Sequence, residues 1–213
     1  MMADVEKETV LDVDEVFKLV AEKLDEHGIE WWVDYGSLLG CYREGKRIEW
    51  DDDYDIGYWV EDAPKVLEAL LEIPYVFISW NLYFSVGKVD TDRREHMVCV
   101  KPHVKTEVGV YEILQPMRYF LKKLNKIFGS RILENVLGFI ITIIVRLFPL
   151  DVQKMIVKVN MITCIQVKYK GTKREYAKTY SNKMNGTNVS IPCGVKKILI
   201  RMYGEDFMIP KRK

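Results

Sequence analysis

The chain has 213 residues, of which 48% are hydrophobic, 30% charged and 12% aromatic. This composition excludes a disordered tail, a collagen-like repeat and a small disulfide-rich scaffold, and it predicts one compact domain with at most a small subdomain. The net charge of +1 hides an asymmetry: residues 1–112 contain 12 Lys and Arg against 26 Asp and Glu, whereas residues 113–213 contain 20 against 5. Either the acidic part meets metal or cations while the basic part meets phosphate or an anionic surface, or the two parts attract each other.

The first half of the chain alternates helical and strand patterns, which predicts an α+β unit with a mixed sheet. Apolar residues at helical spacing, a capping box between Thr9 and Asp12 and a stop at Gly28 indicate the first helix. Ser37 is placed to cap a short second helix. The expected elements in chain order are a helix over 10–27, a strand over 29–33, a helix over 38–43, a strand over 51–60, a helix over 62–71, and strands over 75–80, 82–89, 97–103 and 108–114.

Beyond Pro116 the sequence becomes apolar and basic and predicts helices over 118–148 and 152–166. The uncharged run 135–145 is far shorter than the roughly 20 residues that span a bilayer, so we expect a buried helix. Basic and apolar residues interleave at the start of this region, which fits either a helix on an anionic membrane surface or a solvated basic face. We therefore expect an α+β core over 1–116 and a helical, basic region over 117–213 that packs on it.

The cysteines lie far apart and form no C-x-x-C pair, so free thiols are expected rather than a zinc knuckle or a disulfide framework. The first ten residues are acidic where a signal peptide would be basic, which predicts a cytoplasmic or membrane-peripheral protein, or a Golgi-lumenal one if an anchor precedes this sequence. Glycosylation sequons begin at Asn185 and Asn188, but so short a motif often arises by chance.

The densest chemical signal is a carboxylate cluster in the segment Trp50-Asp51-Asp52-Asp53-Tyr54-Asp55. These carboxylates repel one another unless a cation binds or water solvates them fully. On a strand, Asp51, Asp53 and Asp55 share one face, so Asp53 and Asp55 can converge on a divalent cation. With no histidine or cysteine adjacent in the sequence, the oxygen ligands favour Mg²⁺ or Mn²⁺ over Zn²⁺.

Other interpretations of this cluster are an exposed acidic turn and two further motifs. An EF-hand loop beginning at Asp51 fails, because its sixth and twelfth positions hold Ile56 and Asp62 instead of Gly and Glu. Asp51-Asp52-x-x-Asp55 also fits the aspartate-rich motif of prenyl-diphosphate enzymes. That motif lies on a helix, whereas the Ile-Gly-Tyr-Trp-Val that follows here favours a strand.

Upstream of the cluster, Gly36 and Ser37 precede a predicted helix start, where free backbone N–H groups favour a phosphate. A third carboxylate from another strand would complete a two-metal site. Glu112 is the first candidate and Glu107 the second, although a glutamate at the end of a strand is equally compatible with a surface position.

These segments resemble the LicD family, which includes fukutin and fukutin-related protein. The likeness rests on residues 29–43, with Gly-Ser-Leu-Leu-Gly followed by Arg43, and on residues 48–57, with Trp-Asp-Asp-Asp-Tyr-Asp. The closing segment 203–210, Tyr-Gly-Glu-Asp-Phe-Met-Ile-Pro, resembles the end of the family's pattern. One departure is Glu112-Ile113-Leu114-Gln115-Pro116, where the family usually has Asp-Ile-Phe-Pro.

The resemblance implies a nucleotidyltransferase fold of the DNA polymerase β type and transfer of a phospho-alcohol, such as phosphocholine or ribitol phosphate, from a CDP-linked donor to a glycan or glycolipid hydroxyl. It implies no nucleic-acid partner. By position, the resemblance implies that Asp53 and Asp55 are metal ligands and that Glu112 is the third carboxylate. Gly36 and Ser37 would contact the donor phosphate, and Arg43 would be a phosphate or structural partner. Asp51 is a further acid.

The expected mechanism is metal-assisted displacement at the donor phosphorus with CMP as leaving group, in which Glu112 or Asp51 helps to deprotonate the acceptor. Lys88 is either an additional phosphate contact or an ordinary exposed lysine, and no histidine is assigned chemistry. Two alternatives are transfer of the nucleoside monophosphate itself and a non-catalytic protein that binds glycan or membrane. A membrane contact would run through residues 118–148.

Overall fold

The protein is described by a computed structural model that covers residues 12–73, 76–78, 84–86, 98–113, 147–155 and 167–210. Lys88, nearly all of the helix expected over 118–148 and most of the helix expected over 152–166 lie outside these residues. Residues 150–155 are helical, in agreement with the start of the latter. Within the part of the chain that is described, no helix is long and apolar enough to cross a membrane.

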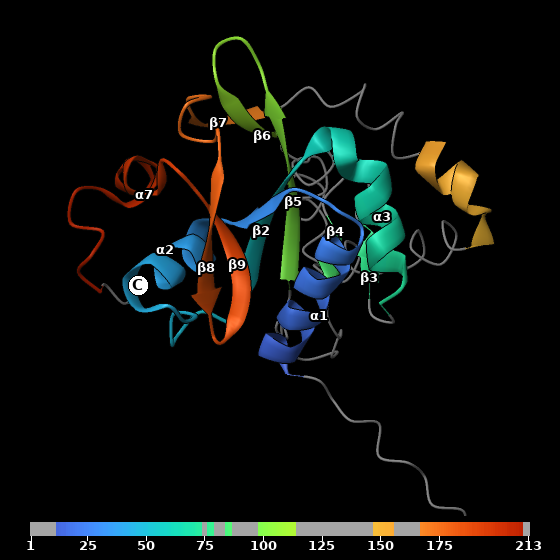
Figure 1. The fold of residues 1–213 in the computed structure, drawn as a ribbon, viewed down its shortest axis with the longest axis horizontal. Helices are drawn as coiled ribbons and strands as arrows, with labels where there is room; N and C mark the ends of the chain where they lie inside the picture. The colour runs from blue at the N-terminus through green and yellow to red at the C-terminus, as the bar shows by residue number, and fades with distance from the viewer. Residues whose placement is uncertain are drawn as a thin grey trace, which may run out of the picture.

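A seven-stranded mixed sheet forms the centre of the molecule (Figure 1). Its strands are β1 (Trp31–Val33), β2 (Tyr54–Trp59), β3 (Val76–Ile78), β4 (Phe84–Val86), β5 (Val98–Lys105), β6 (Val110–Ile113) and β7 (Val167–Gly171). Five of them follow the order β1-β2-β5-β4-β3, and β6 and β7 continue from β5. The β2–β5 pair is parallel and the others are antiparallel, so the expected α+β class with a mixed sheet is confirmed.

Four helices are named by their bounds in the described residues: α1 (Val13–Glu26), α2 (Tyr35–Glu44), α3 (Ala63–Leu71) and α7 (Val195–Tyr203). The first helix begins at Val13 and not at residue 10 as expected, and its capping box is formed by Asp12 and Glu15; Thr9 lies outside the described residues. Asp12 is the N-cap, so the side chain three positions later is the one that reaches back. Gly28 has φ +63°, the left-handed conformation expected after a helix.

The two faces of the sheet differ in character because side chains alternate along each strand. One face is apolar: the buried ring of Tyr54 on β2 stacks on Phe17 of α1, with ring centroids 3.9 Å apart. The other face carries Asp55 and Gly57 on β2 and the polar residues of β5. At Gly57 an added Cβ would overlap the indole of Trp32, so glycine is needed for that ring to lie on the strand.

The C-terminal part is not mainly helical where it is described. Residues 167–210 contain β7, a hairpin of β8 (Thr179–Met184) and β9 (Thr187–Pro192), and only one α-helix, α7. Asn185 and Gly186 form the turn with φ of 48° and 81°, as an Asn-Gly hairpin turn requires. The hairpin packs on β1 and α2, and α7 packs on α2 (Figure 1). Since β7 pairs with β6, the sheet continues across the boundary expected near residue 116.

Candidate active site

The start of α2 is tied to β2 by backbone and side-chain hydrogen bonds. The N-cap is Asp34, not Ser37, and the carboxylate of Asp34 accepts from the N–H of Tyr35 at 2.9 Å. The N–H of Asp34 donates to the carbonyl oxygen of Asp55 at 2.9 Å. In return the N–H of Asp55 donates to the Ser37 hydroxyl at 2.8 Å. The structure therefore brings Ser37 next to Asp55, as the sequence predicts.

Gly36 lies where the carboxylate of Asp51 approaches the first turn of α2. A Cβ added at Gly36 would overlap that carboxylate. The predicted pairing of the glycine with the acidic segment thus has a steric basis, since only glycine leaves room for an oxygen this close to the helix start.

The acidic segment gathers around Asp53 and Asp55. Strand β2 begins at Tyr54, so Asp55 is on the strand, whereas Asp51 and Asp53 come before it and the expected shared strand face does not extend to them. Possible ligand atoms of Asp53, Asp55 and Cys99 all lie within 4.8 Å of one another, and those of Asp51, Asp52 and Asp53 form a second such group.

The electrostatics of this group fit a divalent cation. Burial, together with the Asp51 carboxylate, raises the pKa of Asp53 to about 6. Burial also raises the pKa of Asp55 to about 6, with a further contribution from Asp53 and against the opposing effect of Lys101. A bound cation offsets the repulsion between carboxylates that are buried close together, and carboxylate oxygens suit Mg²⁺ or Mn²⁺. Asp53 and Asp55 are the residues that would hold it.

A lysine that sequence reasoning did not single out lies within this site. The Nζ of Lys101 is 2.5 Å from Oδ1 of Asp55 and 4.1 Å from the centroid of the Tyr35 ring. Lys101 lies on β5 between Cys99 and His103, and the three alternate positions share the face of the sheet that carries Asp55. Polar residues at every second position of an otherwise apolar strand are the signal that could have identified them.

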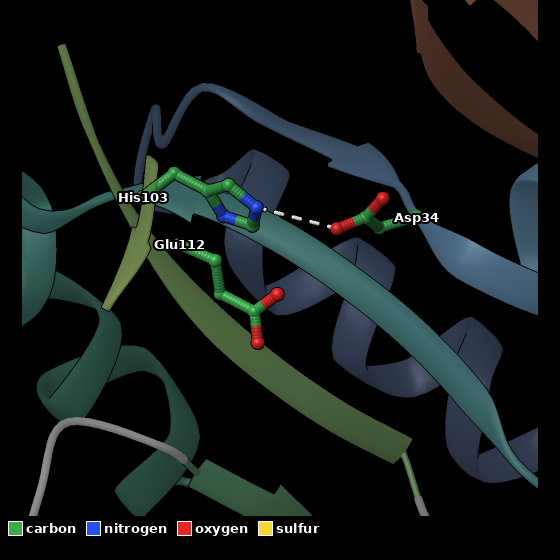
Figure 2. A group of neighbouring side chains, drawn as sticks. All are labelled: Asp34, His103 and Glu112. Atoms are coloured by element: carbon green, nitrogen blue, oxygen red, sulfur yellow. Dashed lines mark ion pairs between the residues drawn. The ribbon is translucent and has the colours of Figure 1, made fainter. Parts of the chain in front are cut away.

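A second buried polar group lies on the same face of the sheet, made by Asp34, His103 and Glu112 (Figure 2). Nε2 of His103 is 3.2 Å from the carboxylate of Asp34, and both side chains are fully buried. Glu112 is opposite His103 in the β5–β6 register. Burial lowers the pKa of His103 and raises that of Glu112.

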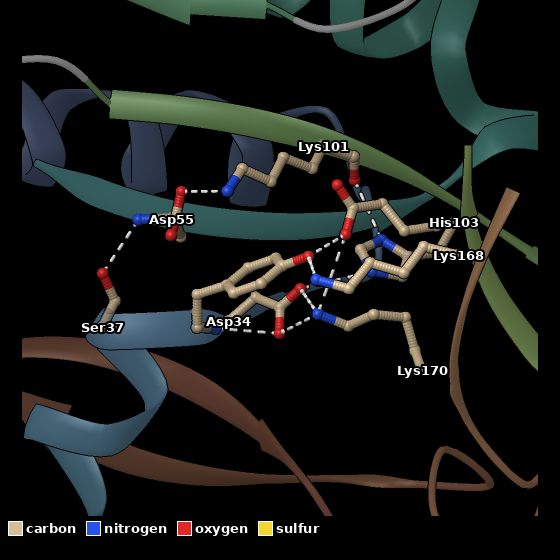
Figure 3. A network of polar contacts seen from close by, with 9 residues as sticks. Asp34, Ser37, Asp55, Lys101, His103, Lys168 and Lys170 are labelled. Carbon is tan, nitrogen blue, oxygen red and sulfur yellow. Dashed lines mark hydrogen bonds and ion pairs between the residues drawn. The ribbon is translucent and has the colours of Figure 1, made fainter. Parts of the chain in front are cut away.

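Lys170 of β7 neutralises this group from the C-terminal part of the chain (Figure 3). Its Nζ lies 2.9 Å from the Asp34 carboxylate and 3.8 Å from that of Glu112. Although burial raises the pKa of Asp34, the Lys170 ammonium and the His103 ring outweigh it and hold that pKa well below its usual range. Asp34 is therefore ionised and Lys170 is its main counter-charge.

Tyr35 separates the two polar groups. Its backbone has φ 45°, a left-handed conformation that is rare for residues other than glycine. Its hydroxyl donates a short hydrogen bond to Glu112 and accepts one from Lys168 at 2.8 Å. The ring lies 3.5 Å from the Nζ of Lys170, on the side of the second group. Lys101, paired with Asp55, contacts the same ring.

The other carboxylates that the sequence offered as metal ligands lie away from Asp53 and Asp55. The structure places Glu112 with Asp34 and His103 and not with Asp53 and Asp55, because the β5–β6 pairing sets it opposite His103. The expected set of three carboxylates is thus not assembled, and Glu107 is exposed in the loop after β5.

Arg43 has a structural role. Its guanidinium donates to the carbonyl oxygens of Phe207 and Ile209, the latter at 3.1 Å. These bonds hold the segment after α7 against α2. Of the two roles that the sequence left open for Arg43, the structure supports the structural one and shows no approach to the acidic group.

Part of the chain is similar in sequence to known proteins. Residues 28–107 match the family model described as LicD/FKTN/FKRP, nucleotidyltransferase domain. The chain is 42% identical over 49 residues to ribitol 5-phosphate transferase FKRP of mouse and of human, a match that covers 23% of this chain and 10% of each relative. It is 28% identical over 87 residues to an uncharacterized protein of Rickettsia typhi, covering 39% of this chain and 28% of that protein.

The chain thus spans about a tenth of the length of the FKRP proteins that it matches. The segment matched by the family model contains α2, the acidic cluster and all of β5. Residues 28–107 of the chain therefore resemble the LicD family.

Proposed function

We propose that this protein is a metal-dependent phosphotransferase with a nucleotidyltransferase-like fold, and that it moves a phospho-alcohol from a CDP-linked donor to the hydroxyl of a glycan or glycolipid. The observation that carries the proposal is the Asp53–Asp55 pair: possible ligand atoms of the two carboxylates lie within 4.8 Å of each other, and both carboxylates have a raised pKa. The backbone N–H of Asp55 also ties the pair to Ser37 in the first turn of α2. The match of residues 28–107 to the family model and the name of the FKRP relatives support the reaction class.

The position of each residue suggests its role in the proposed reaction. Asp53 and Asp55 would hold Mg²⁺ or Mn²⁺, which when bound supplies charge neutralisation to the donor diphosphate. Because Gly36 has no Cβ, an oxygen can come close to the start of α2, as that of Asp51 does, and backbone N–H groups at a helix start favour a phosphate. Lys101 keeps one oxygen of Asp55 in place at 2.5 Å and adds positive charge beside the reacting phosphate.

The acceptor hydroxyl must lose its proton to a nearby base, and the structure offers two carboxylates. Asp51 lies beside Asp53 and Gly36, and burial raises its pKa. Glu112 lies on the other side of Tyr35, and burial raises its pKa as well. A raised pKa brings a carboxylate closer to the neutral range where a general base works best. The variants Asp51→Asn and Glu112→Gln separate the two assignments, since the base is the residue whose loss lowers kcat without weakening metal binding.

The test is a transfer assay read by mass. The protein is incubated with Mg²⁺, CDP-choline or CDP-ribitol and a glycan acceptor, and we expect the acceptor to gain the mass of the phospho-alcohol. Asp53→Asn and Asp55→Asn should abolish transfer, while Glu61→Gln, an exposed acid just beyond β2, should leave it unchanged. A gain of CMP would favour nucleotidyl transfer. Metal-independent nucleotide binding that survives both Asn variants would favour a non-catalytic binding protein.

A further inference from the structure

A cavity of about 300 Å³ lies beside the second polar group, between the start of α2, β7 and α7. Its lining includes Tyr35, Lys168, Lys170, Arg201, Met202 and Tyr203. Neither Asp53 nor Asp55 lines it, so the cavity is separate from the proposed metal site. Its volume is at the lower end of roughly 300–1,000 Å³ for small-molecule sites, which suits a single sugar or polyol phosphate better than a complete nucleotide-linked donor.

The charged groups that line this cavity are all cationic. Lys168 and Lys170 are two positions apart on β7, so their side chains lie on the same face and both reach the Tyr35 ring. Arg201 comes from α7. The Lys170 ammonium is buried against Asp34, and the Arg201 guanidinium pairs with Glu175 at 2.9 Å. Lys168 is exposed, and its Nζ donates to the Tyr35 hydroxyl at 2.8 Å. Lys168 is therefore the cation best placed to meet an incoming anion.

The rest of the wall is aromatic and apolar. Tyr203 is about a third exposed and the Tyr35 ring is half-buried, so both rings present surface to a ligand. A wall of aromatic rings with cationic tips binds a compact ligand that combines an apolar or sugar body with a negative charge.

The ring of Tyr35 lies between the cavity and the proposed metal site. Lys101, which pairs with Asp55, contacts the same Tyr35 ring that Lys168 and Lys170 contact. A ligand in the cavity would thus lie next to a phosphate held at Asp53 and Asp55. Two ligand sites that share a wall are what a group-transfer reaction needs.

We propose that this cavity is the acceptor subsite and that it takes an acceptor bearing an anionic group, a phosphate or carboxylate, on a sugar or polyol. This inference rests on the proposed function, because the word acceptor presupposes transfer. The phosphate of a donor nucleotide has the same chemistry, so the experiment must distinguish the two sources.

The test measures binding without metal, so that the Asp53–Asp55 site does not contribute. Ribose 5-phosphate is titrated into the full chain in EDTA, with uncharged ribose as the comparison. We expect ribose 5-phosphate to bind and ribose to bind at least tenfold more weakly. Lys168→Gln, which keeps a hydrogen-bond donor for Tyr35 but loses the charge, should weaken ribose 5-phosphate binding about tenfold. Lys178→Gln removes an exposed lysine outside the cavity lining and should leave the Kd unchanged.

Three outcomes overturn the inference. Ribose 5-phosphate binding that is absent, or equal in Lys168→Gln and the parent protein, shows that the cavity is not an anion site. Competitive displacement of ribose 5-phosphate by CMP in EDTA shows that the cavity takes the donor. If Mg²⁺-dependent CMP binding is missing while ribose 5-phosphate still binds through Lys168, the proposed function fails and the acceptor role goes with it, but the anion site stands. Simultaneous binding of Mg²⁺-CMP and ribose 5-phosphate supports the proposal.

Discussion

Replacing Lys170 by methionine should destabilise the protein more than any exposed lysine could. Lys170 is 2% exposed and its Nζ lies 2.9 Å from Asp34, which is fully buried. Methionine preserves much of the side-chain volume but leaves the Asp34 carboxylate without its main counter-charge. Removing one partner of a buried ion pair costs about 3–5 kcal/mol.

The structure favours the lower end of that range. Asp34 keeps the hydrogen bond from the Tyr35 N–H, and the His103 ring, 3.2 Å away, can take up a proton. We therefore expect Lys170→Met to lower the free energy of unfolding by about 3 kcal/mol, which corresponds to about 6–12 °C in Tm for a chain of this size. Since Lys170 helps to lower the pKa of His103, that pKa should rise in the variant.

Urea denaturation gives the free energy, and NMR titration of the imidazole gives the pKa of His103. The matched control is Lys168→Met on the same strand and the same side of β7, where an exposed lysine is lost and a change under about 1 kcal/mol is expected. The double variant Asp34→Asn/Lys170→Met should lose less stability than the two single variants lose together. Equal stability of Lys170→Met and Lys168→Met, with an unmoved His103 pKa, would refute the assignment of Lys170 as the counter-charge of Asp34.

Three further results are expected. Asp53→Asn should stabilise the metal-free protein by about 1 kcal/mol at neutral pH, because a partly buried carboxylate whose pKa is raised to about 6 destabilises the native state while it is ionised. This gain in stability should fade as the pH falls through 6, since the carboxyl of the parent protein then becomes protonated. The variant should also lose the rise in Tm that Mg²⁺ gives the parent protein. Gly36→Ala should leave the Tm within a few degrees, since the flexible Asp51 side chain can move, yet weaken Mn²⁺ binding measured by electron paramagnetic resonance. Arg43→Met should speed amide exchange around Phe207, measured by mass spectrometry, without changing metal binding.

Local sequence signals were sufficient for the elements that depend on nearby residues. The apolar spacing of α1 and the positive φ of Gly28 follow from interactions within a few residues. The turn at Asn185-Gly186 is equally local, although the sequon at Asn185 draws attention to glycosylation instead. The Nδ2 of Asn185 in fact donates to Asp14 at 3.0 Å and to the Tyr54 hydroxyl at 2.9 Å. That turn joins strands β8 and β9, which the sequence had assigned to a helical region.

The site shows the same division between local and distant contacts. Asp53, Asp55 and the Gly36-Ser37 turn were predicted together, and the hydrogen bond from Asp55 to Ser37 joins them. Glu112 is expected in the same group from its chemical type, its predicted strand and its place in the family's pattern. Its actual neighbours depend on which strands pair on either side of β6, with His103 opposite it on β5 and Lys168 opposite it on β7. Such a register between strands distant in sequence cannot be obtained from the periodicity of one strand.

The charge asymmetry of the chain is resolved at this same place. Asp34 and Glu112 belong to the acidic residues 1–112, and Lys168 and Lys170 belong to the basic residues that follow. The two parts meet through the Asp34–Lys170 ion pair inside one continuous sheet, so their attraction is an internal feature of the fold. The segment matched by the LicD family model ends at residue 107, before either lysine. The matched segment alone would leave Asp34 ionised and buried without its counter-charge, so β7 is an integral part of the site.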